Sequence, residues 1–424
     1  MSRLLAAMLA AGACASSLQA QTSMSSAPAD GGPVLSLDQA IAAAGATAPA
    51  AEAASAAIDA ARANRTLAEL RPNPVAQGQI ENIAGSGAYH GLGSAETTIG
   101  LAFPVERGGK RRARVAVADA QRTRAEIEAA IAAADIRLQV TQLYIDSIAA
   151  ARRATAATDQ ARIAEDALNA ARVRLRAGRV SPLEVQRAEV GRINAEAEVA
   201  RQQRLADVAR TNLARRIGRS IAALDDGLLD RLPASDAAGP VLSVSPVGTL
   251  ALAAAKADFV TADAGVRLAR ANRVPDLNVG PAVRRLEATN DVAAVFTVSM
   301  PIPLFNNGGA AVAQATAQRA QADALRRVRA LDVAQAIADA QAQAENASIT
   351  ARAASGPALR AAQEAARIAR IGYREGKFGQ LELLDAERSL AETRLSAINA
   401  LATYQIARAQ MERLTAPAPK GEMQ

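Results

Sequence analysis

The sequence predicts a mainly helical α+β chain in which two strands followed by a long helical hairpin occur twice. Roughly a quarter of the 424 residues are Ala, and aromatic residues are only 2%. Because Ala loses little entropy in a helix and fills little space in a core, this composition favours long helices packed at close range. A run without Gly or Pro extends from 110 to 177, and as one helix it would span about 100 Å.

The same plan is found in both halves of the chain. Gly178 recurs as Gly376, 198 residues later, and the Leu-Glu pair at 183–184 recurs at 381–382. Self-similarity of this kind indicates two copies of one structural unit. The predicted parts are a signal peptide at 1–20, a flexible segment at 21–36, a first repeat at 37–224, a connector at 225–246, a second repeat at 247–415 and a tail at 416–424.

The N-terminus has the layout of a secretory signal peptide. Arg3 is followed by an apolar stretch from 4 to 15 and by a polar exit that ends at Ala20. A basic start, a short apolar run and a small residue at the cleavage site are typical of such leaders. Alternatively, Cys14 follows a weak lipidation motif and would become a lipidated mature N-terminus. Both interpretations predict an exported chain.

Each repeat is predicted to begin with one helix, at 37–69 in the first half and at 247–272 in the second. A proline follows each of these helices, Pro72 and Pro275. Proline lacks a backbone N–H and has a fixed φ, so it stops a helix.

Four strands are predicted from alternating apolar and polar residues, at 74–86, 95–106, 275–287 and 291–303. In the second of them, Ile99, Leu101 and Phe103 share one face, and Thr98 and Gly100 share the other. Strands with one apolar face and one small or polar face suit a barrel with lipid outside and water inside. A half-buried hairpin in a soluble protein gives the same pattern, and the strands alone favour that interpretation.

A long helical hairpin is predicted to close each repeat, at 110–218 and at 310–414. The first is broken at Gly178–Pro182 and the second at Gly376–Gly379, with a flaw in the second at Gly356-Pro357. Apolar residues recur at coiled-coil spacing. Helices of this length cannot bury themselves within one chain, so neighbours from other chains are expected.

The residue inventory argues against enzymatic chemistry. His90 is the only histidine and Cys14 the only cysteine, so neither a Cys/His zinc site nor a Cys–His nucleophile can form within one chain. The sequence has no Walker-type phosphate loop and no dinucleotide-binding fingerprint. The net charge of +7 is spread along the helices beside acidic residues, whereas a nucleic-acid patch would be clustered. We therefore expect no enzyme, no cofactor and no nucleic-acid partner.

The chain resembles the TolC-type outer-membrane factor family of Gram-negative efflux and secretion systems. Besides the duplicated plan, the residues that carry the resemblance are Gly178 to Val185, Gly372 to Gly376 and Leu381 to Glu387. Two shorter motifs, Arg71 to Pro74 and Pro104 to Arg111, look like the heavy-metal (CzcC-like) branch of that family.

The resemblance implies an assembly and a location. The family forms homotrimers in which four strands per chain build one twelve-stranded barrel in the outer membrane. The barrel continues into a periplasmic α-helical tunnel, which reaches an inner-membrane pump of the resistance–nodulation–division type through a periplasmic membrane-fusion adaptor. Outer-membrane lipid, the adaptor, the pump and two further copies of the chain are therefore the expected partners.

The resemblance also suggests functional positions at the two hairpin breaks. The expected periplasmic aperture is formed by Glu382, Asp385, Tyr373 and Arg176, and the expected adaptor-docking turns by Gly178, Val180, Ser181, Gly376, Phe378 and Gly379. Glu382 and Asp385 are three residues apart and so share one helix face, where threefold symmetry would gather six carboxylates on the axis. From the residues alone, these acids could equally be solvated surface groups, and the breaks could be ordinary hairpin turns.

The function expected from these observations is passive export of heavy-metal cations through a trimeric channel. The residues leave two alternatives open. One is efflux of organic solutes or antibiotics through the same type of channel. The other is a periplasmic coiled-coil scaffold or adaptor that forms no barrel.

Overall fold

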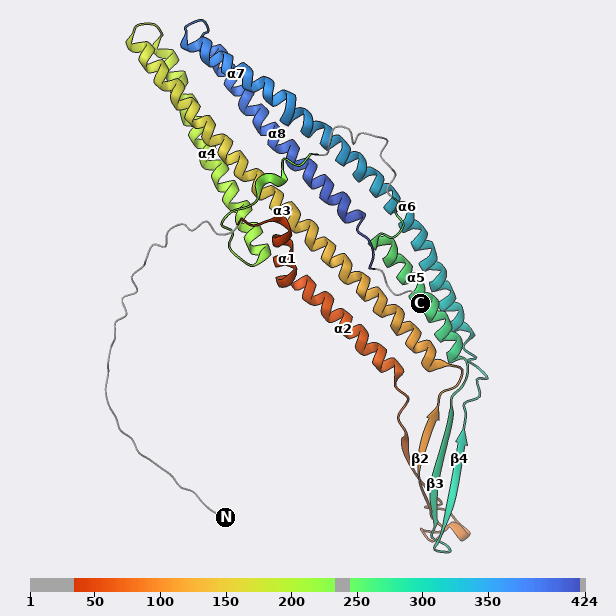
Figure 1. The fold of residues 1–424 in the computed structure, drawn as a ribbon. Helices are drawn as coiled ribbons and strands as arrows, with labels where there is room; N and C mark the ends of the chain where they lie inside the picture. Colours follow the sequence, from red (N-terminus) through yellow and green to blue (C-terminus); the bar gives the residue numbers. More distant parts are fainter. Residues whose placement is uncertain (1–33, 233–244, 420–424) are drawn as a thin grey trace, which may run out of the picture.

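The computed structural model describes residues 34–232 and 245–419. The predicted signal peptide, Cys14 and much of the predicted connector lie outside these described residues. The chain is elongated, with a four-stranded sheet at one end and the turns of two helical hairpins at the other (Figure 1). The prediction of a mainly helical α+β chain with four strands is confirmed.

The elements follow one another in the expected order. In the first half they are α1 (Leu37–Thr47), α2 (Pro49–Glu69), β1 (Val75–Glu81), η1 (Gly87–Tyr89), β2 (Glu96–Val105), α3 (Lys110–Arg176), α4 (Pro182–Ile217) and η2 (Asp226–Leu228). In the second half they are α5 (Leu250–Asn272), β3 (Leu277–Leu286), β4 (Asp291–Ser299), α6 (Gly309–Ala353), η4 (Ala354–Ala358), α7 (Leu359–Arg374) and α8 (Gln380–Leu414).

The single helix predicted at 37–69 is wrong, because two helices occupy this region. They are bent by 54° at Ala48, which has an extended backbone and precedes Pro49. A residue before proline is pushed out of the helical region, and Pro49 then begins α2 where its missing N–H is harmless. None of the described helices could cross a bilayer alone, although α1 and α2 taken together reach the required length and apolarity.

The sheet is antiparallel throughout, in the order β1-β2-β3-β4, so β1 and β4 are its two edges. Both outer strands end earlier than predicted. Asn82 adopts a positive φ of 56° directly after β1, and β4 ends two residues before Pro301. Gly280 lies where β3 approaches β2 closely, since a Cβ there would be 1.9 Å from the carbonyl oxygen of Leu101.

The two faces of the sheet differ in polarity, as the alternation predicted. Ile99, Phe296 and Val298 lie on an apolar face that stays exposed within this chain. The opposite face carries polar side chains, which line a shallow pocket: Gln77, Gln79, Thr98, Asn278, Thr297 and Ser299. An exposed apolar face contradicts the alternative of a hairpin half-buried in its own chain, because no described helix covers it.

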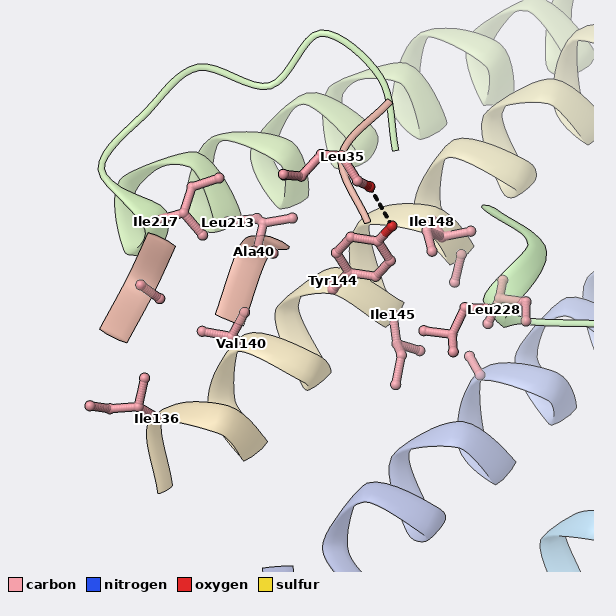
Figure 2. Packing of buried hydrophobic residues seen from close by; sticks show 14 of the residues in the cluster. Leu35, Ala40, Ile136, Val140, Tyr144, Ile145, Ile148, Leu213, Ile217 and Leu228 are labelled. Atoms are coloured by element: carbon pink, nitrogen blue, oxygen red, sulfur yellow. Dashed lines mark hydrogen bonds between the residues drawn. The ribbon is translucent and has the colours of Figure 1, made fainter. Parts of the chain in front are cut away.

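The largest apolar cluster, here called the waist cluster, surrounds the middle of α3 (Figure 2). Its main members are Leu35, Ala40, Ala44, Ile136, Val140, Tyr144, Ile145, Ile148, Leu213, Ile217 and Leu228. The Tyr144 side chain is 1% exposed, and its hydroxyl lies 2.7 Å from the carbonyl oxygen of Leu35 and 3.0 Å from that of Asp225. Burial raises the pKa of this hydroxyl to about 12. The waist cluster therefore fixes α1 and the segment after α4 to the middle of α3.

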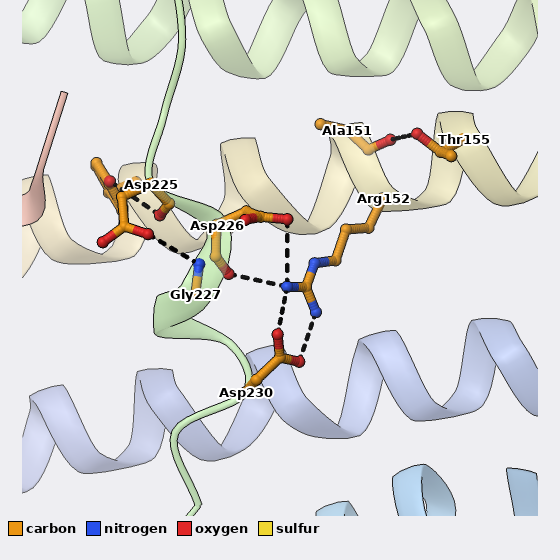
Figure 3. A network of polar contacts seen from close by, with 8 residues as sticks. Ala151, Arg152, Thr155, Asp225, Asp226, Gly227 and Asp230 are labelled. Carbon is orange, nitrogen blue, oxygen red and sulfur yellow. Dashed lines mark hydrogen bonds and ion pairs between the residues drawn. The ribbon is translucent and has the colours of Figure 1, made fainter. Parts of the chain in front are cut away.

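A polar network fastens the same segment from its outer side (Figure 3). Arg152 on α3 donates to both carboxylate oxygens of Asp230, at 2.7 and 2.6 Å, and to the carbonyl oxygen of Asp226 at 2.9 Å. These hydrogen bonds lower the pKa of Asp230. Bidentate pairing of this kind orders both partners.

The outer helix of the second hairpin is interrupted where the sequence predicted a flaw. Residues Ala354–Ala358 form a π-helical turn that contains Pro357, between α6 and α7. Proline removes one backbone donor and clashes with the preceding turn, which accounts for the locally wider helix. In the first hairpin, α3 continues for 67 residues without such an interruption.

Candidate functional site

Both hairpin turns lie at the end of the molecule opposite the sheet (Figure 1). Two residues after the end of α3 and of α7 stands a glycine with positive φ, 69° at Gly178 and 75° at Gly376. In the first turn the N–H of Arg179 donates to the carbonyl of Arg174 at 2.9 Å, and the N–H of Gly178 donates to that of Leu175 at 2.9 Å. The second turn repeats both bonds. These are Schellman caps, which satisfy the last carbonyls of a helix and favour glycine at the left-handed position.

The residues predicted to dock an adaptor are accessible in this arrangement. Gly178, Ser181, Gly376 and Gly379 are exposed, and Val180 is half-buried. Phe378 is exposed as well, but its ring lies over Gly372, where a Cβ would come within 2.2 Å of it. The second turn therefore presents a fixed aromatic side chain, which the first turn lacks.

Tyr373 is the predicted aperture residue with the most contacts. Its side chain is 4% exposed, and the guanidinium of Arg174 lies 3.9 Å from the centre of its ring. Arg174 also donates to the carbonyl oxygen of Tyr373 at 2.5 Å. The buried Tyr373 hydroxyl has no hydrogen-bond partner among the described residues. A cation over an aromatic face is attractive, so this contact joins the two hairpins near their turns.

Arg174, and not the predicted Arg176, contacts Tyr373. Arg176 is exposed, and the structure does not bring it to Tyr373. The two arginines are two residues apart and point in different directions around α3. The rotation of α3 about its own axis, relative to α7, decides which of the two arginines faces Tyr373.

A second contact joins the two hairpins, and no local sequence pattern indicates it. The side-chain amide of Gln380 donates to the carbonyl oxygen of Glu184 at 3.2 Å. Glu184 is in the first turn of α4, where carbonyl groups are normally used within the helix. Together with the Arg174–Tyr373 contact, this bond holds the two turns in one relative position.

Glu382 and Asp385 are exposed on the first turns of α8. The Glu382 carboxylate lies close to Gly379, because a Cβ on that glycine would be 2.8 Å from its Oε2 atom. Both carboxylates are therefore open to solvent in a single chain. They could meet an ion or further carboxylates of other copies, but they form no ligand cage by themselves.

Two ion pairs lie at equivalent positions of the two hairpins, between the paired helices near each turn. Arg172 pairs with Glu189 at 2.9 Å in the first hairpin, and Arg370 pairs with Glu387 in the second, each residue 198 positions later. The Glu189 side chain is 28% exposed, whereas that of Glu387 is 4% exposed. Hydrogen bonding to Glu387 raises the pKa of Arg370.

No described group of three or more His, Cys, Asp or Glu side chains is arranged to hold a metal ion. The arrangement at the turns is one of exposed loops and exposed carboxylates on a rigid helical frame. It is suited to contacts with other chains and to attraction of cations, which need no permanent ligands.

Comparison with known proteins agrees with this geometry. The Outer membrane efflux protein family matches residues 40–219 and 247–416, which are the two repeated halves. The chain belongs to this family.

Among similar proteins, the cobalt-zinc-cadmium resistance protein CzcC of Cupriavidus metallidurans is 32% identical over 345 residues, 80% of each chain. The nickel and cobalt resistance protein CnrC of the same organism is 31% identical over 287 residues, 66% of this chain and 68% of CnrC. Both the family and its heavy-metal branch were predicted correctly.

Solved structures share the fold of this efflux protein at low sequence identity. CusC, whose structures concern folding and transmembrane channel formation, is 19% identical, with a TM-score of 0.72 over 90% of this chain and 92% of CusC. The outer membrane protein VceC of Vibrio cholerae is 18% identical, with a TM-score of 0.71 over 90% of this chain and 96% of VceC. The mainly helical chain with a four-stranded sheet is thus the fold that CusC and VceC also have.

Proposed function

We propose that the chain is the outer-membrane channel subunit of a tripartite efflux system that exports heavy-metal cations. The observation that carries the proposal is the polarity of the sheet. An exposed apolar face, a polar opposite face and two long hairpins leaving the same end together suit a pore that crosses a membrane and continues as a tube.

More than one copy is needed to complete this pore, and we propose three, the number that the resemblance to the family implies. Four strands per chain cannot close a barrel, because the smallest closed membrane barrels have about eight. Among the described residues, the outer edges of β1 and β4 have no strand partner. Twelve strands from three chains would remove every free edge, and the hairpins would then bury their remaining apolar residues against one another.

The hairpin turns would form the periplasmic entrance. In a trimer, Glu382 and Asp385 would gather six carboxylates near the axis, attracting cations to the opening. The exposed turns around Gly178 and Gly376 would bind the periplasmic adaptor that connects the channel to its inner-membrane pump. The Arg174–Tyr373 contact would hold the two hairpins together in the form described by the structure.

The cargo is proposed from the relatives, since their names report resistance to cobalt, zinc, cadmium and nickel. A strain that lacks the gene, tested on a panel of metal salts and drugs, should become sensitive to metals and not to drugs. Drug sensitivity alone would favour organic solutes as cargo. Recovery of the protein in the soluble periplasmic fraction would favour a scaffold without a barrel.

The sharpest test of the entrance is ion selectivity in planar bilayers. Glu382→Gln combined with Asp385→Asn should lower the preference for cations, because it removes the negative charge at the constriction. The matched control is Glu184→Gln, at the position equivalent to Glu382 in the first hairpin, which should have a smaller effect. Unchanged selectivity in the double variant would show that these carboxylates lie away from the constriction.

A further inference from the structure

Two exposed apolar corners stand at opposite edges of the sheet, both at its helical end. The first, the β4 corner, follows strand β4 and consists of Ile302, Leu304 and Phe305. The second, the β1 corner, extends from the end of α2 to the first residue of strand β1 and consists of Leu67, Leu70 and Val75. Phe305 is fully exposed and Leu304 is 79% exposed, while Leu67 is 65% exposed. Clustered large apolar side chains of this kind mark a contact with another molecule.

The β4 corner is held in place although its side chains are uncovered. The N–H of Leu304 donates to the carbonyl of Ile302 at 2.9 Å. The guanidinium of Arg273 donates to the carbonyl of Asn307 at 3.1 Å, and the side chain of Asn306 accepts the N–H of Gly308 at 3.0 Å. A groove of about 830 Å³ runs between this corner, the end of α5 and the start of β3. The corner is therefore a pre-ordered surface beside an open groove.

The β1 corner is held in the same manner. Arg111 donates to the carbonyl of Glu69 at 2.5 Å, and Arg114 donates to the carbonyl of Leu70 at 3.2 Å. Both arginines extend from the start of α3. They fix the end of α2 and the entry into β1, so Leu67 and Leu70 project from an ordered backbone. Pre-ordering lowers the entropy lost when a surface binds its partner.

Strand direction places the two corners at matching positions of neighbouring copies. β4 runs from the far end of the sheet towards the helices, and β1 runs away from them, so the two strands are antiparallel. If β4 of one copy pairs with β1 of the next, the segment after β4 meets the segment before β1. The same surfaces meet at every junction, so the contact is head-to-tail and can close a ring.

We propose that the β4 corner of one copy docks on the β1 corner of the next, with Leu70 of that second copy seated beside Phe305. This inference rests on the proposed trimer and identifies the contact that fixes one chain to the next where the sheet meets the helices. A second copy suits the site better than lipid, because each corner lies directly beside a strand edge that needs a hydrogen-bonding partner.

Disulfide cross-linking tests the contact in the full chain. With Cys14→Ala as background, Leu70→Cys and Leu304→Cys in one chain should give linked dimers and trimers on oxidation, while either single variant should give none. The matched control combines Leu70→Cys with Leu331→Cys, an exposed leucine on α6, and should give no ladder. The mass of the assembly under native conditions is measured on the same samples and reports the oligomeric state.

The results separate the inference from the function on which it rests. Trimers by native mass without a Leu70–Leu304 link would overturn the corner contact and leave the channel proposal intact. Absence of any oligomer would overturn both. As a second measurement, Phe305→Ser should weaken association of the copies on the order of tenfold or more, the loss expected for one buried ring. Phe296→Ser, an exposed ring on the apolar sheet face, should leave association unchanged, and equal effects of both would also contradict the contact.

Discussion

The two hairpins have one plan but differ in how they are held. The first is anchored by α3, an unbroken helix of 67 residues that contributes more side chains to the waist cluster than any other element. The second has a π-helical turn between α6 and α7. Its helices α6 and α8 pack through a cluster in which four alanines (Ala347, Ala351, Ala400 and Ala407) outnumber the larger Leu401 and Tyr404. The two hairpins therefore share a sequence plan but differ in the packing of their apolar side chains.

This difference indicates a division of labour. Large aliphatic side chains interlock and resist sliding, whereas small residues allow close approach with few interlocking contacts. A π-helical turn marks a place where a helix can bend. We infer that the first hairpin serves as the fixed frame and the second as the part that can adjust at the entrance.

The largest effect is expected in the first hairpin, the inferred fixed frame. Tyr144→Ala should destabilise the chain by about 3–5 kcal/mol, because it opens a cavity and leaves backbone carbonyls without their donor. Tyr404→Ala, in the cluster of the second hairpin, should destabilise the chain clearly less, since its hydroxyl has no such carbonyl partners among the described residues. Thermal unfolding followed by circular dichroism measures both. Equal losses would contradict the proposed contrast.

A smaller effect is expected at the equivalent ion pairs. Glu387→Gln should lower the free energy of unfolding by about 2 kcal/mol, because it leaves Arg370 beside a buried neutral group. The partial exposure of Arg370 limits this loss. Glu189→Gln should have little effect, since the pair in the first hairpin is more exposed. Denaturant unfolding of the two single variants provides the comparison. A loss at Glu189 as large as that at Glu387 would show that burial does not set the difference.

The smallest effect is expected at the π-helical turn. Pro357→Ala restores a backbone donor and should stabilise the outer helix of the second hairpin by about 1 kcal/mol. Hydrogen exchange of residues 359–374 should become slower. Pro182→Ala is the control, because Pro182 begins α4, where its missing N–H is already unneeded. Unchanged exchange in Pro357→Ala would show that this turn does not limit the motion of α7.

Much of the fold could be predicted from local sequence patterns. The alternation at Ile99, Leu101 and Phe103 was sufficient to predict a strand with one apolar face, and glycines at 178 and 376 were sufficient to predict the turns. The break at Ala48 is consistent with Pro49, but the Ala-rich sequence on both sides favours one continuous helix. The candidate aperture and docking roles remain proposals, since they depend on other chains.

The sequence by itself determined the extent of the two long helical hairpins, the faces of the strands and the positions of the turns, because backbone propensities and periodic patterns act over a few residues. Only the tertiary structure decided that Arg174 rather than Arg176 meets Tyr373, and that Glu387 is buried where Glu189 is not. These contacts join residues on different helices. They depend on how each helix is rotated about its axis against its neighbours, which no local pattern specifies.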